Sequence, residues 1–200
     1  MRVPAGRLAC AVTVAAALLA GSAHGDTTTV RDQRNVRSNP LDIRAATAGH
    51  RGDALSHTIR TWKLWRSKVL ESRSDRPRIV CIYVWRAKKA ASRKPDYQIC
   101  ATYRKKKLRG YVYEAASKRR LSARVTVRRV NRRSITLIFG PELIGDPRFY
   151  RWQAVTGFTG KGCPRDPPFR YGCDDSAPTG KSKLHSLVAK PPTAAVTRTA

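Results

Sequence analysis

Apolar and polar side chains alternate along several short segments of the chain, and this period of two is the pattern of half-buried β-strands. The clearest segments are residues 78–86, 96–103 and 150–158. The other predicted strands are residues 41–49, 54–61, 108–113, 121–127 and 134–139. About eight short, closely spaced strands predict an all-β fold, an antiparallel β-sandwich of the jelly-roll or immunoglobulin-like kind.

The two central segments also predict their own register. A hairpin that turns within residues 87–95 places Cys81 directly opposite Cys100. Opposed residues at a non-hydrogen-bonded position lie close enough to form a disulfide. The remaining pair, Cys163 and Cys173, then forms a second disulfide that closes a small loop, while the fifth cysteine, Cys10, lies in an N-terminal apolar run.

This register assigns the side chains of the central hairpin to two faces. One face is a conventional core, with Val80, Ile82 and Val84 pointing inward. The other face carries Tyr83 and Trp85 among polar groups. In the other strands, alternation predicts that the following residues point inward: Leu55, His57, Ile59, Leu121, Ala123, Val125, Val127, Tyr150, Trp152, Ala154, Thr156 and Phe158.

Only one segment has helical spacing. Residues 61–70 place Trp62, Trp65 and Val69 on one side of a short helix, with Thr61 as the N-cap. Residues 140–147 read as a connector or a single helical turn.

The first 25 residues have the pattern of a signal peptide. Two arginines precede an apolar run at residues 8–20, and small residues follow, with Ala23 and Gly25 at the −3 and −1 positions of a cleavage site. The run is too short for a transmembrane helix, which needs about 20 apolar residues. We therefore expect a protein that is secreted, either extracellular or associated with the cell wall, and that has no membrane span.

The mature chain is expected to form one domain. Residues 26–39 are polar and aperiodic, which predicts a disordered lead-in. The β-sandwich domain is expected at residues 40–187, followed by a flexible, low-complexity tail at residues 188–200.

The charge of the chain is strongly positive. The 41 lysines and arginines against 13 acids give a formal net charge of +28, which attracts polyanions. For an exported protein the expected partner is a glycan or an anionic cell-wall polymer; no zinc finger, ribonucleoprotein motif or basic helix indicates specific nucleic-acid recognition. Because arginine is spread along the chain, a general compositional bias is the alternative explanation.

Two groups of residues are candidates for ligand binding. Tyr83 and Trp85, two residues apart on one strand face, could form a flat platform for sugar rings; alternatively, the Trp62/Trp65 helix covers them and completes a second small core. Arg104, Lys105, Lys106 and Lys107 form the densest basic cluster. Further clusters at residues 118–120 and 128–133 also lie near turns, and turns that share one end of the sandwich would make a single basic edge.

Motifs for catalysis or cofactor binding are sparse. No nucleophile elbow, zinc-protease motif or phosphate-cradling glycine loop is present, and Glu71, Glu114 and Glu142 lie in no acid-bearing motif. The best set of calcium ligands is Asp174 and Asp175 with Asp42 or Asp53, but the basic character of the chain opposes it. We therefore expect a non-catalytic binding module without a cofactor or metal; a small exported hydrolase and a structural accessory protein remain the alternatives.

Four segments carry a resemblance to a known group of domains. These are PLDIR at residues 40–44, SHTIRTW at 56–62, YRWQAVT at 150–156 and DSAP at 175–178. Together they resemble a group of secreted bacterial β-sandwich domains, which in turn is distantly similar to DOMON-like domains and family 9 carbohydrate-binding modules. The resemblance implies ligand binding at a sandwich, and it assigns no binding residue in this chain.

Overall fold

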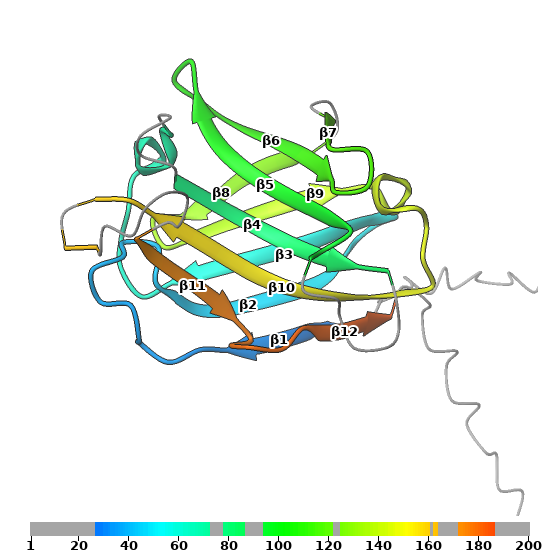
Figure 1. The fold of residues 1–200 in the computed structure, drawn as a ribbon, viewed down its shortest axis with the longest axis horizontal. Helices are drawn as coiled ribbons and strands as arrows, with labels where there is room; N and C mark the ends of the chain where they lie inside the picture. Colours follow the sequence, from blue (N-terminus) through cyan, green and yellow to red (C-terminus); the bar gives the residue numbers. More distant parts are fainter. Residues whose placement is uncertain are drawn as a thin grey trace, which may run out of the picture.

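The computed structural model describes residues 27–72, 78–86, 94–121, 125–160, 162–163 and 172–186. These residues form two antiparallel sheets packed in two layers, as the sequence predicted (Figure 1). The signal peptide and the C-terminal tail predicted above lie outside the described residues.

The first layer is a five-stranded sheet with the strand order β1-β2-β3-β9-β8. Its strands are β1 (Thr28–Arg31), β2 (Ile43–Arg51), β3 (Ala54–Thr61), β8 (Thr126–Asn131) and β9 (Ser134–Phe139).

The second layer is a seven-stranded sheet with the order β11-β10-β4-β5-β6-β7, in which β12 also pairs with β10. Its strands are β4 (Arg78–Trp85), β5 (Tyr97–Arg104), β6 (Lys107–Glu114), β7 (Arg119–Leu121), β10 (Phe149–Phe158), β11 (Cys173–Ala177) and β12 (Lys183–Ser186). Two 3₁₀ turns complete the described fold, η1 (Ser67–Leu70) and η2 (Pro141–Ile144), the second within the predicted connector.

The predicted register of the central hairpin is confirmed. Cys81 pairs with Cys100 and Ile82 with Ile99, and both predicted disulfides, Cys81–Cys100 and Cys163–Cys173, are present. The inward face of this hairpin packs against inward residues of the other sheet, and these residues are fully or almost fully buried. They include Val80, Ile82, Val84 and Ile99 of the hairpin and Leu55, Ile59, Ile135 and Leu137 of the other sheet; Tyr150 and Trp152 of the adjacent strand β10 are buried in the same core.

The expectation of a disordered lead-in at residues 26–39 is wrong. Thr28–Arg31 forms the edge strand β1, which pairs with Ala45–Ala48 of β2, and Asn39 is fully buried. This strand is held by backbone hydrogen bonds and contributes only Val30 to the core, so its sequence shows no hydrophobic pattern.

The predicted helix at residues 61–70 is also wrong, apart from its last turn. Thr61 ends β3 instead of capping a helix, and its hydroxyl donates to the carbonyl oxygens of Lys63 (2.7 Å) and Arg133 (3.1 Å). Trp65 joins the core through an irregular segment, and only Ser67–Leu70 turns helically.

The predicted strand at residues 121–127 is instead two strands in different sheets. Leu121 ends β7 in the seven-stranded sheet and is 42% exposed, whereas β8 starts at Thr126 in the other layer. Apolar and polar residues alternate in the sequence from the end of β7 to the start of β8, although these strands belong to different sheets. The pattern therefore predicted one strand where there are two. Val125 and Val127 do pack against the core.

A buried polar seam joins the two sheets near the start of β2. Asn39 donates through Nδ2 to the carbonyl oxygen of Cys173 (3.0 Å) and accepts the amide hydrogen of Leu41 through Oδ1 (2.8 Å). The Thr156 hydroxyl of β10 donates to the Leu41 carbonyl oxygen (3.0 Å). In β11, Asp175 accepts the amide hydrogen of Ile43 (2.5 Å). The seam therefore fixes the entry into β2 against β10 and β11.

Two carboxyl groups of this seam have raised pKa values. Burial and the charges of Asp32 and Asp42 raise the pKa of Asp175 to about 7, although its hydrogen bonds from backbone amides act in the opposite direction. Burial, followed by the charge of Asp32, likewise raises the pKa of Asp42. Because the unfolded carboxyl groups titrate near 4, the folded chain binds protons more tightly between about pH 4 and 7.

We predict that this pair makes the folded state less stable as the pH rises through that window. Asp42→Asn removes one charge and keeps the size of the side chain, so the loss of unfolding free energy between pH 4 and 8 should be smaller in this variant than in the original chain. Urea unfolding at several pH values measures this slope. Asp53→Asn, at the exposed β2–β3 turn, is the matched control and should keep the original dependence of unfolding free energy on pH. An unchanged dependence in Asp42→Asn would contradict the assignment of this pH effect to the Asp42–Asp175 pair.

Candidate anion-binding cleft

The pairing of β5 with β6 carries the register of the central hairpin one strand further. Ala101 pairs with Gly110 and Ile99 with Val112 on the inward face. The residues between them therefore point outward, because side chains alternate across a strand. This outward set comprises Cys100, Thr102 and Arg104 on β5 and Lys107, Arg109, Tyr111 and Tyr113 on β6.

The two strands are joined by a two-residue turn made of lysines. Lys105 and Lys106 both have positive φ values, 50° and 60°, and Arg104 pairs with Lys107. Such a turn suits the twist of a hairpin, but it normally contains Asn and Gly, since other side chains are strained at positive φ. The turn therefore places two cations at a position where the backbone disfavours them.

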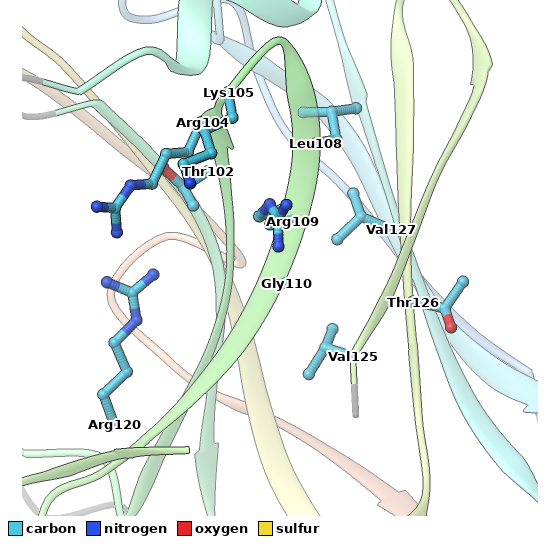
Figure 2. Close-up of a pocket in the computed structure, with 10 residues that line it drawn as sticks. All are labelled: Thr102, Arg104, Lys105, Leu108, Arg109, Gly110, Arg120, Val125, Thr126 and Val127. Carbon is cyan, nitrogen blue, oxygen red and sulfur yellow. The ribbon is translucent and has the colours of Figure 1, made fainter. Parts of the chain in front are cut away.

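A cleft of about 760 Å³ runs along β6 beside this turn. Figure 2 shows Thr102, Arg104 and Arg120 on one side of β6 and Leu108, Val125 and Val127 on the other. The remaining lining residues are Lys105, Arg109, Gly110 and Thr126. The cleft thus combines a basic side on the outer sheet surface with an apolar side that faces β8.

Gly110 allows β6 and β8 to come this close. A Cβ atom at position 110 would lie 2.5 Å from the side chain of Val125 and 2.7 Å from its carbonyl oxygen. Only a residue without a side chain fits this contact, which brings the start of β8 to the cleft.

The cleft has four positive charges and no acid among its described lining residues. The cations are Arg104, Lys105, Arg109 and Arg120. Within the described part of the chain, no hydrogen bond or ion pair joins the guanidinium group of Arg104 or Arg109 to another residue. By contrast, Arg129, from the third basic cluster, lies over the Trp65 ring (3.6 Å to the centroid) and donates to the Trp65 carbonyl oxygen (2.9 Å). The side chains of Arg104 and Arg109 are therefore available to a ligand, whereas Arg129 is part of the packing.

The aromatic candidates differ from the expected platform. Trp85 is only 6% exposed, and its ring meets that of Tyr83 edge-on, at an interplanar angle of 72°. Tyr83 is half-buried. Trp65, which was expected as part of the alternative cover over these rings, instead belongs to the inter-sheet core, and that core does not include Trp85. The two rings therefore offer no flat surface on which a sugar could stack.

Of the basic residues predicted to bind a ligand, Arg104 and Lys105 line the cleft, while Lys106 and Lys107 are exposed beside it. The structure adds Arg109 and Arg120 to them. The alternation of residues 107–113 contained the signal for Arg109, because it places Lys107, Arg109 and Tyr111 on one face. Arg120 comes from the second basic cluster, which reaches the cleft through the pairing of β6 with β7.

The structure separates most of the candidate calcium ligands. Asp175 lies near Asp42 in the polar seam, but Asp174 and Asp53 are exposed. Among the described residues, no group of three histidine, cysteine or acidic side chains has an arrangement that could hold a metal ion.

The three histidines that follow the predicted leader, His50 on β2, His57 on β3 and His185 on β12, lie close together near Tyr150, which the sequence did not indicate. His57 Nε2 and the Tyr150 hydroxyl share a 2.7 Å hydrogen bond, and the His185 ring lies 5.4 Å from those of His50 and Tyr150. Burial, with smaller contributions from His185 and His50, lowers the pKa of His57 to about 3. His57 therefore stays neutral as a packed core residue.

Comparisons of the chain with protein-family models, curated proteins and solved structures gave no match. The resemblance to DOMON-like domains and family 9 carbohydrate-binding modules remains a prediction. In the described part of the chain, no helix has the length and apolar character needed to cross a membrane.

The lysine turn yields a stability prediction. Replacing it by Lys105→Asn with Lys106→Gly should raise the unfolding free energy by about 1 kcal/mol, because the strain of positive φ is relieved. For a chain of this size, that corresponds to a rise in melting temperature of about 2–4 °C. Thermal unfolding followed by circular dichroism measures it. The control, Lys63→Asn with Lys68→Gly outside the turn, should give no such gain. A lower melting temperature for the turn variant would contradict the claim that Lys105 and Lys106 are strained by their positive φ values.

Proposed function

We propose that this protein is a secreted, non-catalytic binding module that holds an anionic cell-surface polymer, such as a charged glycan, in the cleft along β6. The observation that carries the proposal is the convergence of four cations from β5, β6 and β7 and the turn, without an acid among the described lining residues. A field of one sign in a concave surface concentrates ligands of opposite charge.

A polymer fits this arrangement better than a small anion. The basic row continues from the cleft over Lys106 and Lys107, both exposed, so a ligand with repeated charges can occupy several cations at once. Recognition of a neutral sugar by ring stacking has less support, because Trp85 is buried and edge-on to Tyr83.

Binding to sulfated dextran, with unmodified dextran as the neutral reference, tests the proposal. We expect affinity for the sulfated polymer to fall steeply with salt, because each contact releases condensed counterions. The variant Arg104→Gln with Arg109→Gln should bind about tenfold more weakly at 0.15 M salt and show a flatter salt dependence. Stability should change by less than about 0.5 kcal/mol.

The matched control is Arg31→Gln with Arg60→Gln, which removes the same charge from exposed positions of the five-stranded sheet. Its affinity should stay within about twofold of the original chain, since screening limits charge effects to about 8 Å at this ionic strength. Equal losses in both variants would show that total charge, not the cleft, retains the polymer. Equal binding of sulfated and neutral dextran would also contradict the proposal.

A further inference from the structure

Arg120 is held in place by an aromatic ring on the neighbouring strand. Its guanidinium carbon lies over the ring of Tyr111, 3.7 Å from the centroid. Tyr111 is half-buried on β6 and pairs with Cys100 of the disulfide. A guanidinium that rests on a ring has one face covered, so its N–H groups remain available around its edge. Arg120 therefore presents its donors from a defined position on the outer sheet surface.

Arg104 points toward this fixed group. Figure 2 shows the guanidinium ends of Arg104 and Arg120 directed at one another from the end of β5 and from β7. None of the described lining residues supplies a carboxylate between them. Two like charges that converge in this way repel each other, and an anion bound between them removes the repulsion.

The chemistry of the donors favours one class of anion. A carboxylate has two oxygens with lone pairs in one plane, and a single guanidinium fork can occupy both oxygens. A sulfate or phosphate monoester has three non-bridging oxygens in a tetrahedral arrangement, so it can accept from two guanidinium groups that approach from different elements.

We propose that Arg104 and Arg120 form a subsite for the tetrahedral oxyanion of a sulfate or phosphate monoester on the bound polymer, with Tyr111 as the positioning residue that holds Arg120. This inference rests on the proposed function and narrows its ligand class. It assigns the remaining cations, Lys105 and Arg109, to general attraction of the polymer.

Dextrans of equal length and equal degree of substitution test the subsite. The probes are sulfated, phosphorylated, carboxymethylated and unmodified dextran, measured by isothermal titration calorimetry at 0.15 M NaCl. Sulfate and carboxymethyl groups each carry one charge, so their comparison isolates the shape of the anion. We expect the sulfated polymer, the phosphorylated polymer or both to bind at least about tenfold more tightly than the carboxymethylated one, and their order identifies the ester.

Three variants link this preference to the subsite. Arg120→Lys keeps the charge but removes the guanidinium fork, and Tyr111→Leu removes the ring beneath Arg120. In both variants the ratio of affinities for the ester-bearing and the carboxymethylated dextran should fall to about one. Tyr111→Phe keeps the ring and should therefore retain the preference for the ester. Retention in this variant shows that the ring at position 111 positions Arg120, and that a substitution there does not by itself unfold the protein. Arg60→Lys, on the other sheet, is the control for an arginine-to-lysine change and should retain it as well.

The outcomes separate this inference from the proposal on which it rests. If none of the charged dextrans binds better than unmodified dextran, the proposed function fails. If sulfated, phosphorylated and carboxymethylated dextrans bind equally well, polymer binding stands and the ester subsite is wrong. A preference that survives in both Arg120→Lys and Tyr111→Leu would also overturn the subsite.

Discussion

The antiparallel pairing of β4, β5 and β6 determines which side chains of the seven-stranded sheet enter the core and which reach its outer surface. The Cys81–Cys100 disulfide fixes this register at one cross-strand pair, and a slip by one residue would exchange the two faces. The tight lysine turn then carries the register into β6. As a result, Ile82, Ile99 and Val112 are buried, whereas Arg104 and Arg109 point outward and line the basic side of the cleft.

The two long edges of the sandwich differ in how they are closed. At one edge, β1 and β12 lie side by side (Figure 1), and the Thr28 hydroxyl is 3.2 Å from His185 Nδ1; the polar seam around Asn39 and Asp175 lies on the same side. At the other edge, β6 and β8 meet through the bare backbone of Gly110, and the cleft opens beside this contact. A ligand site at the second edge can therefore form without disturbing the hydrogen bonds that join the sheets.

The sequence contained the central strands, their faces and both disulfides, because regular alternation and opposed cysteines report local geometry. The sequence did not predict β1, because this strand is stabilised by backbone pairing and has no hydrophobic pattern. It also did not predict that β7 and β8 belong to different sheets, because the alternation of apolar and polar residues continues from one to the other. The Trp62–Trp65 spacing looked helical, but Trp65 reaches the core through an irregular segment. For the candidate site, the run of basic residues in the sequence was enough to single out Arg104 and Lys105. The stacking of Arg120 on Tyr111 could not be predicted, since it depends on the pairing of β7 with β6.

The central claim is that anionic ligands bind at the outer surface of β5, β6 and β7, and the side-chain signals of the arginines test it most directly. Arginine Nε–Hε resonances can be followed by NMR while a short sulfated dextran oligosaccharide is added. We expect the resonances of Arg104, Arg109 and Arg120 to shift first and to reach saturation at the same ligand concentration. The resonances of Arg31 and Arg60, on the five-stranded sheet, should not shift. Shifts of equal size on both sheets would contradict a defined cleft and would leave only a diffuse attraction to a basic surface.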